Sequence, residues 1–316
     1  VPRIWEGVRS AVYRNARKQS AFRQLMFFFF VGVGQSYATL LNMFRGLIPQ
    51  FRPRSLVVDK IVSALPLVVL SPFKLIGDVL VFSKLRQRLG GRFVAGVSGG
   101  GALPPYVDKF FQAAGIKLLE GYGLTETGPV LAVRKQHGPV SGTVGPLLPD
   151  IEHRVIGEDG TILPPGEKGL LHVKSEQLML GYYKKPEETG KVLKDGWLDT
   201  GDLTMFTHTG EFRILGRAKD TIVLLGGENV EPQPIEDKLL PSDYIDQVMV
   251  VGQDQKYLGA LVVVNEEKIA EFTREYGIEY VDTEELRDHE EVKHKIRNEI
   301  ESLVNARTGF KMYEQN

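Results

Sequence analysis

The stretch DGWLDTGDLTMFTHTGEFRILGRAKDTIVLLGGENVE, residues 195–231, decides the fold of this chain. Turns at Asp195-Gly196, 208–210 and Gly226-Gly227 divide it. The residues between these turns predict two strands, followed by a third over 222–225. A solvated β-meander is one interpretation. The other is a ligand site, because rigid strands can aim side chains from turns. The charged residues at turn positions are Asp199, Asp202, Arg217, Lys219 and Asp220.

The composition of the 316 residues describes a globular chain with one large and one smaller domain, or with two domains. Lysine and arginine number 39, and aspartate and glutamate number 40, so the formal net charge is 39 − 40 = −1. That balance predicts no nucleic-acid partner. There is no cysteine, which excludes a thiolate nucleophile and a disulfide and agrees with an intracellular, cytoplasmic protein. His289 and His294 do not share a helical face, so they predict no metal pair.

The first 80 residues predict apolar helices. Residues 3–24 are basic and carry apolar residues at helical spacing, which is typical of a basic amphipathic helix. Residues 25–34 and 61–76 are apolar, but each run is shorter than the roughly 20 residues of a membrane-spanning helix. Buried core, or the wall of an apolar ligand tunnel, is the favoured interpretation of residues 25–76. The alternative is a peripheral membrane contact with basic residues at the headgroups.

Residues 84–135 predict an α/β unit. A strand over 93–97 runs into Ser98 and three glycines, a helix follows over 105–114, and a second strand lies over 116–119. The glycines allow a ligand to approach the backbone closely. No Gly-Lys-Ser/Thr follows them, so this is not a lysine-containing phosphate loop.

The sequence GYGLTETGP, residues 121–129, comes directly after the second strand. Tyr122 offers a ring face for stacking. Thr125 offers a hydroxyl and Glu126 a hard oxygen ligand, which suit the phosphates of a nucleotide and Mg²⁺. A tight turn without a ligand is the alternative interpretation.

The remaining segments predict strands and one long helix. Turn residues separate short strands over 153–156 and 169–173, and a polar turn separates two runs over 247–252 and 258–264 that predict a hairpin. Residues 283–304 predict an amphipathic helix whose charged outer face is solvated.

Three motifs in a fixed order resemble those of the adenylate-forming enzymes, which include acyl-CoA synthetases, luciferases and peptide-synthetase adenylation domains. The motifs are GYGLTE, DGWLDTGDL and GRAKD, and a Gly-Gly turn follows them. Residues 195–219 and the opening VPRIWEGV are most similar to long-chain fatty acyl-CoA synthetases. The resemblance is good over 84–265 and weaker through 20–80 and at the end.

The resemblance implies a fold of mixed α/β and α+β class. Residues 1–217 would form the C-terminal part of a large adenylation domain, helical over 1–80, α/β over 84–135 and β-barrel-like over 140–216. Residues 218–316 would form an incomplete, mobile α+β lid, with a hinge near 217–220.

The resemblance also implies roles for single residues. AMP or ATP would lie against Gly99, Gly100, Gly101 and Ala102, with Gly121 and Gly123 flanking the tyrosine. Tyr122 would stack on adenine, and Thr125 and Glu126 would act in catalysis, holding phosphate and Mg²⁺. Asp202 would accept hydrogen bonds from the ribose hydroxyls, and Arg217 would reach the ribose or phosphate. Lys219 would be the hinge, and Gly226, Gly227 and Glu228 would meet the pantetheine arm of coenzyme A.

The implied reaction is ATP-dependent activation of a long-chain fatty acid to an acyl-adenylate, followed by transfer to coenzyme A. Mg²⁺ and positive groups offset the charge that builds on the phosphates. An acyl-carrier-protein ligase is the nearest alternative. A non-catalytic AMP- or acyl-binding module and a membrane-bound fatty acid transporter are alternatives of other classes.

Two parts of the family pattern have no counterpart here. These are the Ser/Thr/Gly-rich loop with a lysine that embraces the β- and γ-phosphates, and the catalytic lysine of a Gly-Lys motif near the C-terminus. Lys311 lies in no such motif, and Asp199 stands where the fatty acyl signature usually has histidine. Together with the opening Val1-Pro2, which lacks an initiator methionine, these gaps predict a fragment that alone forms little acyl-adenylate.

Overall fold

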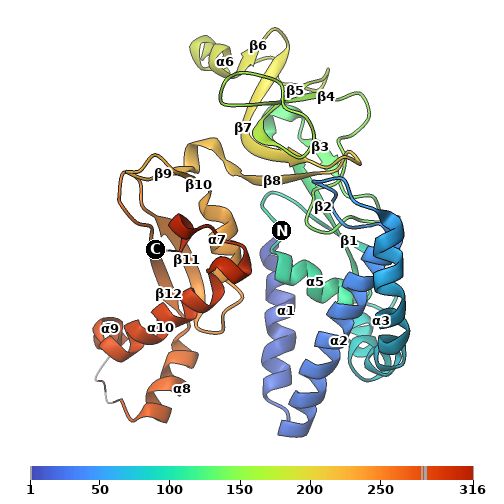
Figure 1. Cartoon of the computed structure of the whole chain (residues 1–316), viewed down its shortest axis with the longest axis vertical. Coiled ribbons are helices and arrows are strands. Elements are labelled where there is room, and N and C mark those ends of the chain that lie inside the picture. The colour runs from blue at the N-terminus through green and yellow to red at the C-terminus, as the bar shows by residue number, and fades with distance from the viewer. Residues whose placement is uncertain (1, 279, 281–282, 316) are drawn as a thin grey trace. The chain divides into compact units, whose positions relative to one another are not determined.

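The computed structural model describes residues 2–278, 280 and 283–315. The chain divides into two compact units, Val1–Ile214 and Leu215–Asn316. The first unit begins with three helices, α1 (Pro2–Arg17), α2 (Ala21–Arg45) and α3 (Leu56–Gly77) (Figure 1). A π-helical turn over Asp78–Phe82 continues α3 into α4 (Ser83–Arg88).

The predicted single helix over 3–24 is wrong, because the chain breaks between α1 and α2. Ser20 has an extended backbone, with φ −59° and ψ 153°. The side-chain Nε2 of Gln24 donates to the carbonyl oxygens of Arg17 and Gln19, at 2.7 and 2.8 Å. These two bonds satisfy acceptors that the break leaves without a helical partner.

A mixed sheet follows the helices. Strand β1 (Ala95–Ser98) pairs parallel with β2 (Lys117–Gly123), and β2 pairs antiparallel with β3 (Val130–Val133). Helix α5 (Pro105–Ala113) connects β1 to β2, as the predicted α/β unit requires. Strand β2 extends through Gly121–Gly123, so Tyr122 lies within the strand and not after it.

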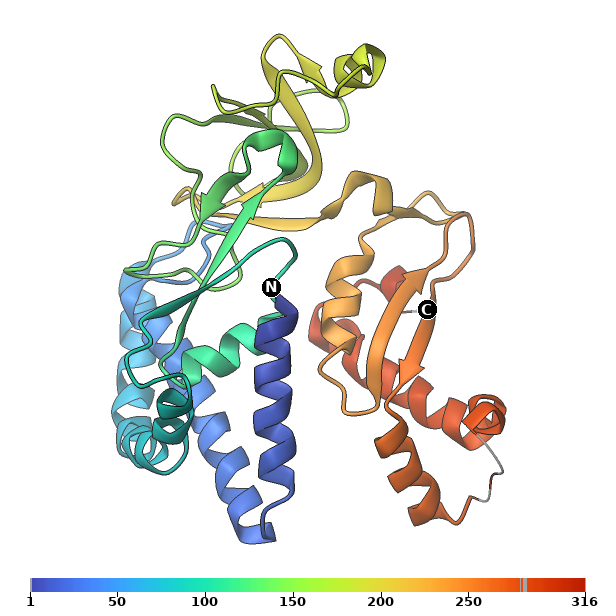
Figure 2. The same ribbon diagram turned by 180° about the vertical axis from the view of Figure 1, so that it is seen from behind.

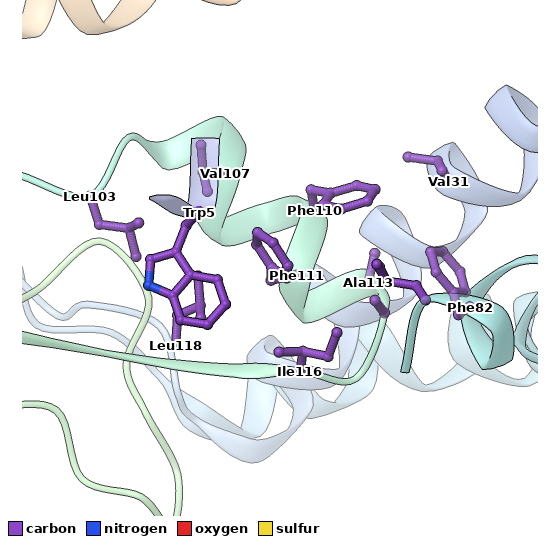
Figure 3. Packing of buried hydrophobic residues seen from close by; sticks show 12 residues of the cluster. Trp5, Val31, Phe82, Leu103, Val107, Phe110, Phe111, Ala113, Ile116 and Leu118 are labelled. Carbon is purple, nitrogen blue, oxygen red and sulfur yellow. The ribbon is translucent and has the colours of Figure 1, made fainter. Parts of the chain in front are cut away.

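The core of the first unit lies around α5. Trp5 of α1 packs edge-on against Phe111 of α5, with ring centroids 5.3 Å apart (Figure 3). Phe110 of α5 and Leu118 of β2 are almost fully buried in the same cluster. Burial of such aromatic side chains is a large favourable contribution to folding.

A second sheet of five strands completes the first unit. Its order is β4-β5-β7-β6, with β8 also paired to β7. The strands are β4 (Glu152–Ile156), β5 (Lys168–Lys174), β6 (Leu193–Lys194), β7 (Trp197–Phe206) and β8 (Phe212–Arg217), and α6 (Pro186–Val192) precedes β6. The predicted strands over 153–156 and 169–173 lie within β4 and β5 and are confirmed.

The second unit is α+β. It contains β9 (Ile222–Val223), β10 (Asn229–Val230), α7 (Pro232–Leu239), β11 (Ile245–Val251), β12 (Gly259–Val264), α8 (Glu266–Tyr276), α9 (Thr283–Asp288) and α10 (Glu290–Leu303) (Figure 2). Strands β11 and β12 form the predicted antiparallel hairpin. The predicted helix over 283–304 is wrong as one piece, because His289 has an extended backbone and caps α10. The third strand predicted over 222–225 is shorter, since the amide of Leu224 already donates across the following turn to the carbonyl oxygen of Glu228, and that of Leu225 donates to the carbonyl oxygen of Gln255.

The prediction that residues 25–76 form buried core is wrong for α3 and holds only for part of α2, which contributes Val31 to the core. Helix α2 has 25 residues, and α3 with its continuation to Arg88 has 33, so both are long and apolar enough to cross a membrane by length and composition. Only 17% and 11% of their most apolar windows are buried. Most of the large apolar side chains of α3 are therefore exposed, whereas most of those of α2 are half-buried or buried.

Candidate active site

The carboxyl ends of β1 and β2 meet at one edge of the mixed sheet. The two strands are parallel, with Ser98 opposite Glu120. The glycine loop after Ser98 therefore begins beside the Gly121–Gly123 segment, which still belongs to β2 and pairs with β3. A Cβ atom on Gly99 would lie 3.3 Å from the carbonyl oxygen of Gly121. Gly100 has φ +77°, a conformation that glycine adopts without strain.

Tyr122 connects this edge to the second sheet. Its hydroxyl donates a hydrogen bond to Oδ2 of Asp202 on β7, at 2.5 Å. Asp202 is 4% exposed, so its carboxylate has little contact with solvent. Hydrogen bonds to a charged acceptor of this kind are stronger than neutral ones.

A bulge in β7 aims Asp202. The pairing of β5 with β7 shifts register where Leu170 and His172 face the segment around Gly201. Gly201 has φ +70°, and its amide donates to Oδ1 of Asp199 at 2.9 Å. The side chain of Thr200 donates to the carbonyl oxygen of Leu171 at 2.8 Å. Asp199 therefore closes the bulge, which gives it a local structural use where the resembling signature has histidine.

Thr125 and Glu126 lie in a short 3₁₀ turn, Thr125–Thr127, after β2. Oε1 of Glu126 accepts a hydrogen bond from the hydroxyl of Tyr182 at 2.8 Å. A Cβ on Gly123 would lie 1.7 Å from the carbonyl oxygen of Pro129, so the turn requires glycine there. The turn is thus held in one shape, with Thr125 exposed and Glu126 half-buried.

A buried ionic network supports the edge from behind. Arg134, the residue after β3, donates to Oδ2 of Asp108 at 2.9 Å and to Oε2 of Glu120 at 2.7 Å. All three residues are less than 8% exposed. The other oxygen of Glu120 accepts from the amide of Leu103 at 2.8 Å, directly after the glycine loop. This network fixes the loop to β2.

The remaining predicted residues lie in the second unit, on and before the β9–β10 hairpin. Arg217 ends β8, and Lys219 is exposed in a 3₁₀ turn over Ala218–Asp220. Gly226 and Gly227 form the hairpin turn, where the amide of Gly227 donates to the carbonyl oxygen of Leu224 at 2.8 Å and Gly227 has φ +87°. Glu228 closes that turn through its carbonyl oxygen, which accepts from the amide of Leu224 at 3.0 Å.

The first unit thus brings together the glycine loop, Tyr122, Thr125, Glu126 and Asp202. Tyr182 was not predicted as a site residue, because the sequence marks it only as one of two tyrosines after Gly181. Glu120 was not predicted either, although this acidic residue directly precedes the GYG sequence.

The residues present fit a nucleotide. Among the described residues, Oγ of the fully buried Ser98 has no hydrogen-bond partner, and it lies at the start of the glycine loop. A Cβ on Gly100 would meet nothing within 4 Å, so the loop borders open space. No group of three or more acidic, histidine or cysteine residues that could hold a metal occurs in the described part. Mg²⁺ would therefore rest on Glu126, on water and on the phosphates, as Mg²⁺ in nucleotide sites commonly does.

Comparison with known proteins agrees with this geometry. The family model of the AMP-binding enzymes matches residues 1–183, and that of the AMP-binding enzyme C-terminal domain matches residues 219–302. The chain belongs to the AMP-binding enzyme family.

Three relatives illustrate the similarity. "Probable acyl-activating enzyme 16, chloroplastic" of Arabidopsis thaliana is 40% identical over 90% of this chain and 41% of its own length. The chloroplastic long-chain-fatty-acid–[acyl-carrier-protein] ligase of the same plant is 37% identical over 85% of this chain and 39% of its own. A long-chain-fatty-acid–CoA ligase of Mycobacterium bovis is 37% identical over 60% of this chain and 30% of its own.

A solved structure shows the same fold. ATP-bound MatB from Rhodopseudomonas palustris superimposes with a TM-score of 0.53 at 26% identity, over 69% of this chain and 39% of its own. The chain spans about two fifths of the length of the first two relatives.

Proposed function

We propose that this chain contributes its site to a two-step ligation of a long-chain fatty acid to coenzyme A. The fatty carboxylate attacks the α-phosphate of ATP and expels pyrophosphate, and the thiol of coenzyme A then attacks the carbonyl of the acyl-adenylate and releases AMP. The hydrogen bond between Tyr122 and Asp202 carries the proposal. It joins the aromatic ring that can stack on adenine to the carboxylate that can accept from the ribose hydroxyls. Both groups are fixed before any ligand arrives.

The other residues of the edge have roles that follow from their chemistry. Thr125 would present its hydroxyl to a phosphate, and Glu126, whose carboxylate is oriented by the hydroxyl of Tyr182, would hold Mg²⁺. Bound Mg²⁺ offsets the negative charge that builds on the phosphates during adenylation. Gly99, Gly100 and Gly101 let the nucleotide and the acyl carbonyl come close to the backbone.

The second unit supplies the proposed lid. Lys219 is the proposed hinge, Arg217 reaches the ribose or phosphate, and Gly226, Gly227 and Glu228 receive the pantetheine arm. Adenylation and thioester formation need different groups at one site, so rotation of a lid between the two steps is a suitable arrangement.

Acyl carrier protein is the second candidate acceptor. The relative named as an acyl-carrier-protein ligase is similar over 85% of this chain, against 60% for the relative named as a CoA ligase. Both acceptors present the same pantetheine thiol, so the proposed loop suits either.

Calorimetric titration of the protein with nucleotide analogues tests the proposal. We expect AMP to bind, 2′-deoxy-AMP to bind more weakly because Asp202 loses a donor, and a palmitoyl-sulfamoyl adenosine to bind more tightly than the acetyl form. Failure of folded protein to bind AMP would overturn the nucleotide site. Equal affinity for the palmitoyl and acetyl forms would overturn the long-chain assignment. With the palmitoyl form bound, tighter binding of holo-acyl carrier protein than of coenzyme A would assign the alternative acceptor.

We also propose that the protein is intracellular and contacts a membrane through residues 25–76. The cytoplasm is the compartment expected from the sequence, and the two Arabidopsis relatives are named as chloroplastic. Fatty acids partition into membranes, so a ligase at the lipid surface meets its substrate there.

A further inference from the structure

We propose that the outer face of α3 docks in the plane of an anionic lipid membrane, without crossing it. The outer face is defined by apolar residues that are each at least 56% exposed: Val57, Val58, Ile61, Val62, Leu65, Val68, Val69, Leu75 and Val79. The inference refines the membrane contact proposed above and does not depend on the ligase chemistry.

Helix α3 has the reverse of the usual polarity. Its polar residues Asp59 and Ser63 are 3% and 0% exposed, although both interrupt an apolar run. Leu65 and Val68, one turn further on, are 73% and 70% exposed. A helix on a water-facing surface places such groups the other way round.

The inward polar groups are paired. Asp59 forms an ion pair with Arg54 at 2.6 Å, and the hydroxyl of Ser63 donates to the carbonyl oxygen of Asp59 at 2.5 Å. Near the other end, Lys74 pairs with Asp78 at 2.6 Å, and Arg86 pairs with the same carboxylate at 3.1 Å. Because its charges are neutralised on the protein side, α3 presents a nearly continuous apolar surface on the other side.

The helical hairpin of α2 and α3 cannot be surrounded by lipid. Val31 of α2 belongs to the core around α5, and Asn42 donates to the side chain of Gln112 on α5 at 2.9 Å. Gly34 packs so closely that a Cβ there would lie 2.9 Å from Phe82. One side of the hairpin is therefore fixed to the domain, which leaves only the outer side for lipid (Figures 1 and 2). That geometry is a monotopic contact and not a span.

The charge around the hairpin selects a lipid with negative headgroups. Residues 1–92 contain 15 lysine and arginine residues and 3 aspartate and glutamate residues, a balance of 15 − 3 = +12, whereas the whole chain carries −1. Three basic residues of the hairpin itself are exposed: Arg45 at the end of α2, Arg52 in the connecting loop and Lys60 in the first turns of α3. A basic segment that flanks an apolar surface is the pattern of membrane-surface helices, and it favours lipid over an apolar protein partner.

Co-sedimentation with lipid vesicles tests the proposal. We expect the protein to bind vesicles of phosphatidylcholine with phosphatidylglycerol, to bind vesicles of phosphatidylcholine alone more weakly, and to lose binding as salt is raised. The double variant Leu65→Glu/Val68→Glu is expected to lose binding roughly tenfold or more, because each carboxylate must leave water to insert.

The matched control is Leu261→Glu/Val263→Glu on β12, which changes the same residue types at 64% and 54% exposure. It should bind vesicles like the unchanged protein. Equal binding by the two double variants would overturn the proposal. So would self-association of the unchanged protein in light scattering that the α3 variant abolishes, since a second copy would then cover the face. AMP binding, measured in parallel, should be the same in all three proteins, so a failed nucleotide site and a failed membrane surface give different results.

Discussion

Two regions of the first unit depart from the usual placement of polar and apolar side chains, in opposite directions. Behind the nucleotide edge, Arg134, Asp108 and Glu120 are charged and buried. On α3, Leu65 and Val68 are apolar and exposed. Each arrangement costs free energy unless something compensates for it. The buried charges compensate one another inside the protein, whereas the exposed apolar face requires a partner outside it.

The largest effect is expected from Arg134, because one guanidinium neutralises two buried carboxylates. Arg134→Met leaves Asp108 and Glu120 buried without their cation and should lower the free energy of unfolding by about 3–5 kcal/mol. Urea denaturation followed by circular dichroism measures the loss. The control Arg23→Met removes an exposed side chain that donates to one acceptor, Oε1 of Gln19, and should cost no more than about 1 kcal/mol. Similar losses of unfolding free energy in both variants would mean that Arg134 does not stabilise the fold by neutralising the two buried carboxylates.

The next effect concerns the front of the same edge. Tyr122→Phe keeps the ring but removes the hydroxyl that orients Asp202, so AMP affinity should fall by a factor of about 10 to 100, or roughly 1.5–3 kcal/mol. Calorimetry measures this change. Tyr183→Phe, at a side chain that is 84% exposed, is the control and should leave AMP affinity unchanged. An unchanged AMP affinity in Tyr122→Phe would mean that orientation of the Asp202 carboxylate by Tyr122 does not contribute to nucleotide recognition.

A smaller effect is expected at Tyr182. Tyr182→Phe removes one hydrogen bond to Glu126, worth about 0.5–1.5 kcal/mol. Affinity for ATP with Mg²⁺ should fall several-fold, while affinity for AMP without Mg²⁺ should not change, because the proposed role of Glu126 is to hold the metal. An equal loss for both ligands would show that Tyr182 supports the turn and not the metal site.

The pH dependence of stability offers a test away from both regions. Partial burial of the ring against the protein lowers the pKa of His153 below its usual value of 6.5, and the ring stacks on Phe206 with centroids 4.3 Å apart. The folded state thus disfavours the protonated ring. The contribution of His153 to the free energy of unfolding is therefore fully present above pH 6.5 and is lost as the pH falls toward the pKa in the folded state. His153→Phe keeps the stacking and should reduce the loss of stability on acidification. Some dependence should remain, because burial also lowers the pKa of His172.

The smallest effect on stability is expected on α3. Leu65→Glu/Val68→Glu places charges where the side chains already face outward, so the free energy of unfolding should change by no more than about 0.5 kcal/mol per site. Urea denaturation checks it. A loss comparable to that of Arg134→Met would mean that the face is part of the core of this unit, and the contrast between the two regions would disappear.

Several elements could be predicted from sequence because their signals are local. The hairpin of β11 and β12, helix α5 and the short strands β4 and β5 follow from alternation, helical spacing and turn residues. The predicted helices over 3–24 and 283–304 failed at Ser20 and His289. At the first break the side chain of Gln24 donates to carbonyl oxygens of the preceding turn, and at the second the side chain of His289 accepts from the amide of Glu291. Helical spacing continues across such breaks, so the pattern does not reveal them.

The α3 face was misjudged for a related reason. The sequence shows an apolar run, and apolar residues are most often buried. The positions of the polar residues Asp59, Ser63, Lys74 and Asp78 hold the missed signal, since they recur on one side of a helix and are the inward side in the structure. In an otherwise apolar helix, a single polar stripe can mark the face that meets the protein.

The sequence by itself determined the family, the class of fold and the identities of Tyr122, Thr125, Glu126 and Asp202 as candidates, because these belong to short motifs whose chemistry is local. Only the tertiary structure decided that Tyr122 touches Asp202, 80 residues away. It also decided that Arg134 lies behind the glycine loop and that α3 is apolar on its outer side. Those relations depend on strand pairing and helix packing between distant segments, and no residue pattern along the chain encodes which side chains such packing brings together.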